Sequence, residues 1–334
     1  MIFKNIELYN VSQLIANENG YDMLRVPQSV EQYMSEKGQP RNRYSSGCEI
    51  RFVCLGDEVK IKLCTKTAEF LFVYVYYGSI PAGWQECRKV ITKNGEITVS
   101  KPNDLDKLKK ISEENNFPFD PSVVRIILPN SPCTIIDVEG ECRPPLESEV
   151  PKKNYLAYGS SITHGSLSLI QMNSYASRVA ENFGANLINM GFAGSACLEK
   201  EMADYIASRA DWDFATIEMG VNVIGMPLDE YEQRVRYMVS TIAGQNPDKK
   251  VFCIDIYYLF AEAGSDKEKW VIAARDIVKR VVQELNLPNT VYVNGLDMLS
   301  IGSAGVSGDF THPNIRGCEC IARNLTDVMT KYLD

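Results

Sequence analysis

The residues with the clearest chemical potential are a late histidine and an earlier serine. The chain has only two histidines among its 334 residues, and His312 lies three residues after Asp309 in the segment Asp-Phe-Thr-His-Pro. Ser161 follows the apolar run 155–158 in the segment Gly-Ser-Ser-Ile-Thr. A serine hydroxyl needs a base to become a nucleophile, and that base needs an orienting acid. We therefore predict Ser161 as nucleophile, His312 as base and Asp309 as orienting acid.

Each motif alone also has a structural interpretation. The segment 159–161 could be a turn that caps a helix, and Asp309 could cap a turn before the last helix. The Gly-x-Ser-x-Gly sequence of the usual α/β-hydrolase nucleophile turn is absent around Ser161, which argues against that arrangement. Considered singly, the two motifs leave both interpretations open.

Two further segments raise the case for catalysis. Gly194 lies in the segment Gly-Phe-Ala-Gly-Ser-Ala after a second apolar run, and Asn222 lies in Met-Gly-Val-Asn after a third. Glycine allows a backbone N–H to approach a ligand closely, and asparagine supplies an amide donor. Together with the Ser161 N–H, these groups could form an oxyanion hole.

Other candidate residues are weaker. His164 follows Ser161 by three residues and could line the substrate pocket, although a variable polar residue of the first helical turn is the alternative. Trp84 could stack on a sugar ring, but core packing or a loop anchor is the expected role. Cys318 and Cys320 resemble a ligand pair, but two histidines are too few for a transition-metal cluster. We therefore predict no metal and no cofactor.

The second half of the chain alternates strands with amphipathic helices. A helix is expected through Tyr175 and Phe183, and another from about Asn314 to Tyr332. The remaining expected elements are strands 155–158, 187–190, 214–217, 251–256 and 291–293 and helices 229–242 and 267–285. This alternation predicts a parallel α/β sheet covered on both faces. The candidate residues all follow strands, at the edge where such sheets bind ligands.

The first half is rich in short strands. Apolar residues alternate with lysines in 59–63, and aromatic or β-branched residues fill 70–77. The pair Asn94-Gly95 between two β-like runs predicts a hairpin, and 105–114 is the expected helix. Frequent turns indicate a β-sandwich, with a jelly roll as the expected form. Pro144, Pro145 and Pro151 mark a linker, which gives predicted domains 1–143 and 154–334 joined by 144–153.

The order of the four blocks, Gly-x-Ser-Ile-Thr, Gly, Gly-x-Asn and Asp-x-x-His-Pro, resembles the SGNH (GDSL-type) hydrolase superfamily over residues 154–334. The resemblance implies a flavodoxin-like, three-layer α/β domain, a Ser161/Asp309/His312 triad, oxyanion donors from Gly194 and Asn222, and ester hydrolysis through an acyl-enzyme without metal. Two positions differ from the family pattern: Ser160 and Val223 each stand where Asp is usual. The preceding β domain resembles that of two-domain carbohydrate esterases.

Net charge, apolar content and cysteine pattern limit the classes of partner and the cellular location that we expect. A net charge of −8 argues against nucleic acid, since phosphate binding needs clustered Lys and Arg. No apolar stretch is long enough to cross a bilayer, and the N-terminus lacks a secretion signal. The ten scattered cysteines suggest reduced core residues in a cytoplasmic protein, with a disulfide framework as the alternative. Secretion stays open if a signal has been removed, and a homo-oligomer is compatible with the sequence.

The predicted function is a serine esterase acting on short acyl, most simply acetyl, esters of a carbohydrate. The expected partner is thus a small-molecule or oligosaccharide ester. Two alternatives remain. A lysophospholipase or thioesterase would act on longer acyl chains, and a carbohydrate-binding protein could have lost its catalytic function, as the departures at Ser160 and Val223 would allow.

Overall fold

The structure is a computed structural model that describes residues 1–65, 67–93, 95–262, 264–300, 302 and 305–333. The chain divides into two compact units. The first comprises 1–28, 42–153 and 184–186, and the second comprises 29–41, 154–183 and 187–334. The short segment 29–41 therefore groups with the second half of the chain. The domain boundaries predicted from sequence place this segment in the first domain, 1–143.

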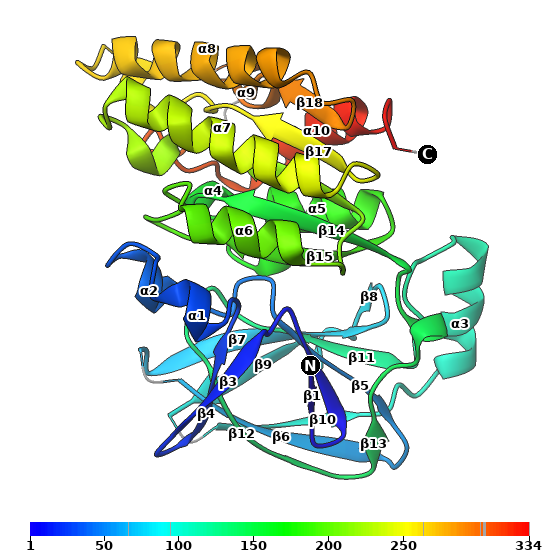
Figure 1. Ribbon diagram of the computed structural model, residues 1–334. Helices are drawn as coiled ribbons and strands as arrows, with labels where there is room; N and C mark the ends of the chain where they lie inside the picture. Colours follow the sequence, from blue (N-terminus) through cyan, green and yellow to red (C-terminus); the bar gives the residue numbers. More distant parts are fainter. Residues whose placement is uncertain (66, 94, 263, 301, 303–304, 334) are drawn as a thin grey trace. The chain divides into compact units, whose positions relative to one another are not determined.

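The first unit is built from two antiparallel sheets (Figure 1). One sheet has the strand order β1-β2-β5-β11-β7-β8, with β13 paired to β5 and β9 paired to β7, and the other has the order β10-β6-β12-β4-β3. Their bounds are β1 Ile2–Phe3, β2 Ile6–Tyr9, β3 Gln13–Asn17, β4 Gly20–Leu24, β5 Glu49–Cys54, β6 Glu58–Cys64, β7 Phe70–Tyr77, β8 Ile80–Pro81, β9 Arg88–Thr92, β10 Gly95–Ser100, β11 Val123–Ile127, β12 Thr134–Glu139 and β13 Cys142–Arg143.

Apolar residues of both sheets share one hydrophobic core. Phe52 and Val75 from the first sheet and Ile61 and Val99 from the second are at most 1% exposed and belong to the same cluster. The alternation of buried and exposed residues in β6 explains this, since only one face of each strand contacts the core. The unit is therefore an antiparallel β-sandwich, as the sequence predicts; its jelly-roll character remains a prediction.

One predicted hairpin is wrong. β9 pairs with β7, whereas β10 pairs with β6 in the other sheet, so the chain passes between sheets here. Asn94 of the predicted turn lies outside the described residues. β9 pairs along its length with β7, and β10 pairs along its length with β6. Ile91 and Ile97 are at most 3% exposed within the shared core. Burial against both sheets has thus prevailed over the local turn signal.

The other local predictions in this unit have mixed outcomes. The helix α3 spans Leu105–Glu114, as predicted. Trp84 is 95% exposed, so the expected core packing is wrong. The chain also contains the short helices α1 Gln28–Glu31 and α2 Gly38–Arg41, which the sequence patterns did not indicate.

The second unit contains a parallel sheet with the strand order β15-β14-β16-β17-β18. This is the 2-1-3-4-5 order of flavodoxin-like folds, counted along the sheet's own strands. The strand bounds are β14 Lys153–Gly159, β15 Ala185–Gly191, β16 Phe214–Glu218, β17 Lys250–Ile254 and β18 Thr290–Val293. β15 and β16 are buried at every residue, as expected for strands covered on both faces.

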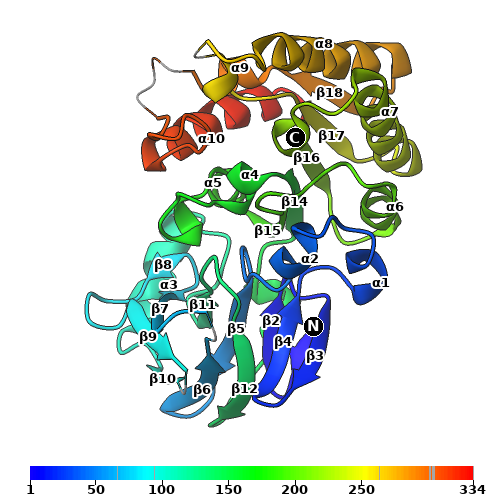
Figure 2. The same ribbon diagram turned by 90° about the vertical axis from the view of Figure 1, so that its left-hand side faces the viewer.

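Helices cover both faces of this sheet, which gives three layers (Figure 2). Helices α6, α7 and α8 pack together on one face, and α5 and α10 pack together on the other. Their bounds are α4 Ser161–His164, α5 Tyr175–Asn182, α6 Lys200–Ser208, α7 Leu228–Gln245, α8 Glu268–Leu285, α9 Gly295–Met298 and α10 Ile315–Met329. The predicted three-layer α/β domain is confirmed, although α6 and α9 were not foreseen and the helix expected to begin at Ser161 is the separate one-turn helix α4.

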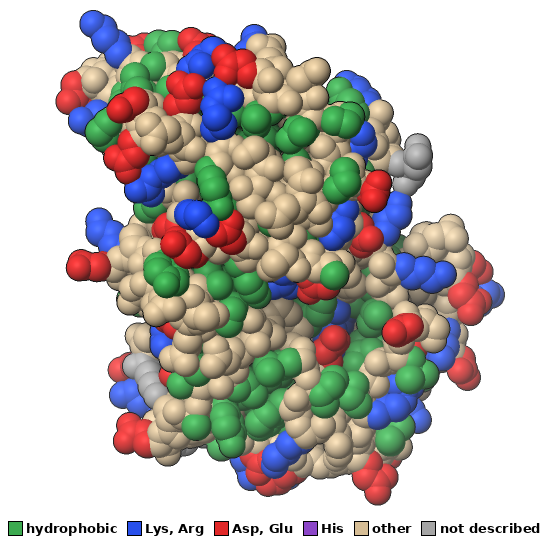
Figure 3. All heavy atoms as spheres, viewed as in Figure 1, with side chains coloured by type: hydrophobic (Ala, Val, Ile, Leu, Met, Phe, Trp, Pro, Cys, Tyr) green, Lys and Arg blue, Asp and Glu red, His purple; other side chains and the backbone are tan. Residues whose placement is uncertain are grey.

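Surface charge is mixed in sign. Figure 3 shows acidic and basic side chains close together over α7 and α8. There, Arg236 of α7 pairs with Glu232 and with Glu284 of α8, and Arg280 also pairs with both acids. The ten cysteines are thiols and not disulfides, and seven of them are buried. Among the described residues, no helix combines the length and apolarity needed to span a membrane.

Candidate active site

The nucleophile candidate occupies a tight turn between strand and helix. Ser161 follows β14 directly and is the first residue of α4. The hydroxyl of Ser160 accepts a hydrogen bond from the Ile162 N–H and so caps this helix, which ends after one turn at Gly165 with φ 85°. The predicted helix-capping role of this segment is therefore present, and it coexists with the arrangement of Ser161 described next.

The structure brings Ser161, His312 and Asp309 into one chain of hydrogen bonds. His312 Nε2 lies 2.7 Å from Ser161 Oγ, and His312 Nδ1 lies 2.7 Å from Asp309 Oδ2. With the ring proton on Nδ1, the imidazole donates to Asp309 and accepts the proton of Ser161. Ser161 is 6% exposed, whereas the side chains of His312 and Asp309 are 27% and 50% exposed. The residues that are far apart in sequence thus meet in the geometry a nucleophile and its base require.

A compact loop orients the acid and the base. The backbone N–H groups of Thr311 and His312 each donate to Asp309 Oδ1 at 2.9 Å, and the Ser307 hydroxyl donates to the same oxygen at 2.6 Å. Phe310 adopts φ 53°, a left-handed conformation that lets the turn close. Residues 303 and 304 of this Gly- and Ser-rich loop lie outside the described residues.

These hydrogen bonds fix the charge on Asp309. Partial burial acts to raise its pKa, but the N–H of His312, the Ser307 hydroxyl and the His312 imidazole outweigh it and hold the pKa of Asp309 well below its usual range. The carboxylate is therefore ionised at any pH at which an esterase works. An ionised acceptor at Nδ1 favours the ring tautomer whose Nε2 can take a proton from Ser161.

The two predicted oxyanion donors follow the neighbouring strands. Gly194 comes after β15 and has φ 68°; apart from its chain neighbours, no described residue has an atom within 4 Å of the position a Cβ would take. Asn222 lies in the 3-10 turn Val221–Val223 after β16, and its amide donates to the carbonyl of Ser195. Among the described residues, the N–H groups of Ser161 and Gly194 donate to no protein acceptor. Asn222 thus also tethers the Gly194 loop, a role that the sequence did not suggest.

The second histidine lies in the interior. His164 is 2% exposed, and its Nδ1 lies 3.1 Å from the carbonyl oxygen of Gly191. The Gln171 amide donates to the His164 carbonyl at 3.1 Å. The structure therefore does not bring His164 into the hydrogen-bonded chain of Ser161, and its burial favours a structural role over the predicted pocket-lining one.

A cavity of about 690 Å³ lies beside the Gly194 loop. The loop itself supplies part of the wall through residues 197–199, and α6, Met226, α7 and the segment 29–41 supply the rest. The lining combines aromatic, amide and charged side chains with a few apolar ones: Tyr33, Ser35, Cys197, Leu198, Glu199, Lys200, Glu201, Met226, Glu230, Gln233, Arg234 and Tyr237. Neither α1 nor this cavity had a signal in the sequence, because both depend on how distant segments meet.

The loop 192–199, which contains Gly194 and lines this cavity through residues 197–199, is held at several points. The Ser35 hydroxyl lies 3.2 Å from the Ser195 hydroxyl, and the Arg234 guanidinium donates to the Cys197 carbonyl at 2.9 Å. Glu199 accepts from the Cys197 N–H at 3.1 Å, and burial raises the pKa of this carboxyl. Among the described residues, no three His, Cys, Asp or Glu side chains gather as a metal site would require.

Comparison with known proteins finds a family match in the second half of the chain. Residues 157–319 match the sequence profile of the GDSL-like Lipase/Acylhydrolase family. A search of curated protein sequences gives no significant match. The family match spans all four sequence blocks that carried the resemblance.

Solved structures share the fold at low sequence identity. A salicylyl-acyltransferase from a tetracycline biosynthetic pathway has a TM-score of 0.77 at 16% identity, over 99% of this chain and 96% of that one. A family two carbohydrate esterase from Cellvibrio japonicus has a TM-score of 0.63 at 14% identity, over 98% and 95%. A family two carbohydrate esterase from Clostridium thermocellum, in complex with cellohexaose, has a TM-score of 0.58 at 15% identity, over 86% and 92%.

These likenesses extend over both units, so the combination of a β-rich unit with an α/β unit recurs in enzymes of this fold. The family match and the fold together support esterase or acyl-transfer chemistry. Residues 157–319 therefore form a GDSL-like lipase/acylhydrolase domain, the domain of an ester hydrolase, and an antiparallel β unit precedes it along the chain.

Proposed function

We propose that the protein is a serine esterase that removes short acyl groups, acetyl above all, from a carbohydrate. The observation that carries the proposal is the hydrogen-bonded chain from Ser161 Oγ through the His312 imidazole to Asp309, with 2.7 Å at each step. Such a chain gives the serine a base and the base an orienting acid. It argues against a site that has lost its catalytic function.

The reaction follows from these contacts. Ser161 Oγ attacks the ester carbonyl carbon while His312 Nε2 takes its proton, and the carbonyl oxygen becomes an oxyanion held by the N–H groups of Ser161 and Gly194 and the Asn222 amide. His312 then gives the proton to the departing alcohol oxygen as the C–O bond breaks. Water attacks the acyl-enzyme by the same route and releases the acid and free Ser161.

The residues of the cavity beside the Gly194 loop are the reason for proposing a carbohydrate as the alcohol part of the substrate. Its walls carry two tyrosines, one glutamine and five charged side chains. Aromatic faces combined with amide and carboxylate groups suit a ligand with many hydroxyls better than a long alkyl chain. A fold shared with an esterase solved with cellohexaose supports the same class.

The acyl-chain preference is tested with p-nitrophenyl esters from acetate to octanoate. We expect kcat/KM to be highest for acetate and to fall with chain length, and Ser161→Ala to abolish turnover of every ester. A higher kcat/KM for octanoate would favour the lysophospholipase or thioesterase alternative. Turnover that survives Ser161→Ala would overturn the proposal itself.

Acyl transfer to a second alcohol is the other outcome that the same residues support, because an acyl-enzyme can react with either water or an alcohol. The fold shared with a salicylyl-acyltransferase gives this outcome weight. The partial exposure of the His312 and Asp309 side chains, at 27% and 50%, favours water as the acceptor. Product analysis in the presence of an added sugar alcohol distinguishes the two: hydrolysis yields free acid, and transfer yields a new ester.

A further inference from the structure

A buried carboxylate lies directly beneath the nucleophile turn. Glu218 is the last residue of β16, the strand that pairs with β14, and it is 2% exposed. It belongs neither to the Ser161, His312 and Asp309 chain nor to the predicted oxyanion donors. The sequence offered no reason to select it, because its position depends on which strands are neighbours in the sheet.

One oxygen of Glu218 accepts three hydrogen bonds from the residues around Ser161. Glu218 Oε2 lies 2.7 Å from the Ser160 N–H nitrogen, 2.9 Å from the Ser160 hydroxyl and 2.9 Å from the Thr163 hydroxyl. The Thr163 hydroxyl also lies 2.7 Å from the hydroxyl of Tyr175 in α5. Ser160 and Thr163 flank Ser161 in the chain, so the same carboxylate oxygen holds the turn on both sides of the nucleophile.

The contact with Ser160 reaches the helix that carries Ser161. The Ser160 hydroxyl donates to Glu218 and accepts from the Ile162 N–H at 3.1 Å. The helix α4 has only four residues, too few to be stable by its own hydrogen bonds. Its position, and with it the position of Ser161 Oγ relative to His312, therefore depends on external contacts such as those with Glu218.

The Glu218 carboxylate also lies close to Gly159, the residue that begins the turn. A Cβ on Gly159 would lie 2.3 Å from Glu218 Oε2 and 2.3 Å from the Thr163 hydroxyl oxygen, so only glycine fits there. Among the described residues, Glu218 Oε1 is buried without a hydrogen-bond partner, and burial raises the pKa of Glu218. A buried carboxyl with one unpartnered oxygen is destabilising, and such groups are frequent at functional sites.

We propose that Glu218 is a positioning residue that fixes Ser161 for attack by clamping the turn 159–163 through Ser160 and Thr163. The inference rests on the proposed role of Ser161 as nucleophile. It also explains why Ser160 stands where the resembled family has Asp: a carboxylate from β16 already occupies the space, and a second one would be repelled by it.

The first test compares Glu218→Gln and Glu218→Ala with Asp255→Asn. Asp255 follows β17, is likewise buried, and accepts from Tyr292 and Gly295 at 2.6 Å, two residues that do not belong to the nucleophile turn. The readouts are the rate constant of fluorophosphonate labelling, kcat and KM for p-nitrophenyl acetate, and Tm. Labelling reports Ser161 reactivity without requiring the sugar.

We expect Glu218→Ala to lower the labelling rate and kcat on the order of 10–100-fold with KM little changed, as misplacement of a nucleophile does. Glu218→Gln should lie between this variant and the wild type, because its amide oxygen still accepts hydrogen bonds. Asp255→Asn should change Tm but leave labelling per folded molecule at the wild-type rate. Labelling of folded Glu218→Gln and Glu218→Ala at the wild-type rate would overturn the proposal.

A compensating pair keeps the test decisive if Glu218→Ala does not fold. Ser160→Asp places a second carboxylate against Glu218 and should slow labelling, and Ser160→Asp combined with Glu218→Gln should recover part of the loss. No recovery would count against the clamp. A wild-type protein that fluorophosphonate does not label would instead overturn the proposed function, and with it this inference.

Discussion

At the scale of single residues, several hydrogen bonds hold the Asp309 carboxylate in the orientation that its role requires. Its Oδ1 accepts from two backbone N–H groups and one hydroxyl, which leaves Oδ2 for the His312 ring. The exposure of its side chain, 50%, shows that orientation here comes from hydrogen bonds and not from burial. Each bond removes one way for the carboxylate to rotate away from the imidazole.

Asp309→Asn should lower kcat for p-nitrophenyl acetate by about 10⁴-fold, because an amide at this position favours the wrong tautomer of the histidine. Tm should change little, since the side chain is half exposed. The measurement is steady-state kinetics beside a thermal unfolding curve. A kcat within tenfold of the wild type would remove Asp309 from the orienting role.

Asn222 has two roles that one substitution can separate in part. Removing an oxyanion donor costs roughly 100–1,000-fold in kcat, and Asn222→Ala should do so with p-nitrophenyl acetate. Because the same amide donates to the Ser195 carbonyl, a modest fall in Tm should accompany it. An unchanged kcat would leave Asn222 as a loop tether alone.

At the scale of elements, the end of β15 sets the position of α4. The Asn189 amide donates to the Thr163 carbonyl at 3.0 Å, and the Phe192 N–H donates to the Gly159 carbonyl at 2.9 Å. A Cβ on Gly191 would lie 2.2 Å from the His164 nitrogen, which is backbone and cannot swing away. Strand β15 and helix α4 are therefore in direct backbone contact.

Gly191→Ala should displace α4 and lower both kcat and Tm, because overpacking against backbone costs roughly 1–3 kcal/mol. The matched control is Gly244→Ala in α7, where, outside the backbone of α7 itself and the chain neighbours, no described residue has an atom within 4 Å of the new Cβ. That helical change should leave kcat unaltered and stabilise the protein by about 0.5–1 kcal/mol. Equal effects of the two substitutions on kcat would show that β15 does not position the nucleophile.

Sequence patterns predicted the elements with the strongest periodicity and missed the short ones. The five parallel strands and the helices α3, α5, α7, α8 and α10 follow from apolar spacing alone. The one-turn helix α4 has no such period and forms through capping and packing. The predicted hairpin around Asn94 was wrong because partners elsewhere in the sandwich bury both strands better.

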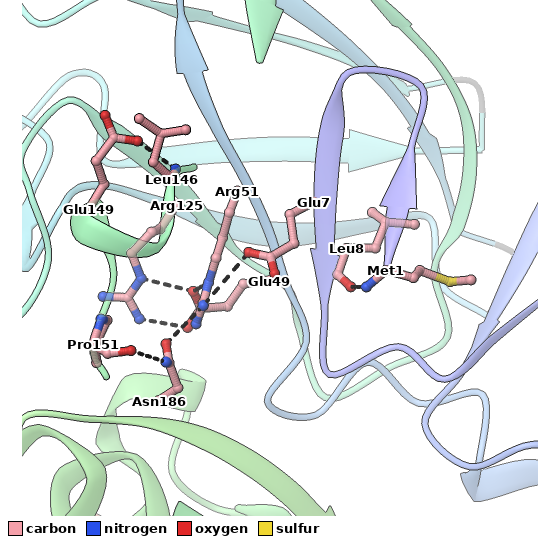
Figure 4. Close-up of polar contacts among 10 residues, drawn as sticks. All are labelled: Met1, Glu7, Leu8, Glu49, Arg51, Arg125, Leu146, Glu149, Pro151 and Asn186. Atoms are coloured by element: carbon pink, nitrogen blue, oxygen red, sulfur yellow. Dashed lines mark hydrogen bonds and ion pairs between the residues drawn. The ribbon is translucent and has the colours of Figure 1, made fainter. Parts of the chain in front are cut away.

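At the scale of the whole molecule, each unit has its own buried polar cluster. In the first unit, Glu49 lies between Arg51 and Arg125 (Figure 4). The Arg125 guanidinium donates to both carboxylate oxygens at 2.6 and 2.8 Å, and Arg51 donates to one at 2.8 Å. Arg51 also donates to Asn186, which donates in turn to the Pro151 carbonyl. These hydrogen bonds thus connect Pro151, near the end of the first unit's main segment, to the central strands β5 and β11.

Because of this cluster, the stability of the first unit depends on pH. Burial opposes ionisation of Glu49, but Arg125 and Arg51 outweigh it and lower its pKa from 4.5 to about 2. A lowered folded-state pKa means that the ion pairs stabilise the unit fully above about pH 4.5 and that this contribution is lost as pH falls toward about 2. Thermal unfolding between pH 2 and 7 measures it.

Glu49→Gln should destabilise the protein at pH 7 by about 3–5 kcal/mol, because two buried guanidinium groups lose their counter-charge. It should also weaken the dependence of Tm on pH between about 2 and 4.5. The same pH dependence in the variant and the wild type would show that another group controls acid unfolding. Glu139→Gln, at an exposed ion pair with Lys62, is the control and should change Tm little.

The residues of the candidate site that belong to rare types could be predicted from sequence. Those whose position depends on which strands or segments are neighbours in the fold could not. His312 stood out because the chain has two histidines, and its contact with Ser161 follows from strand ends meeting at one edge of a parallel sheet. Glu218 and the segment 29–41 gave no signal. Their roles depend on strand order and on chain packing, which no local pattern encodes.

The most direct test of the account is the site of covalent labelling by a fluorophosphonate, mapped by peptide mass spectrometry. We predict one adduct per chain, on Ser161, absent in Ser161→Ala and formed far more slowly in His312→Ala. An adduct on another residue, or an unmodified Ser161 in the folded wild-type protein, would contradict the claim that Ser161 is a nucleophile activated by His312.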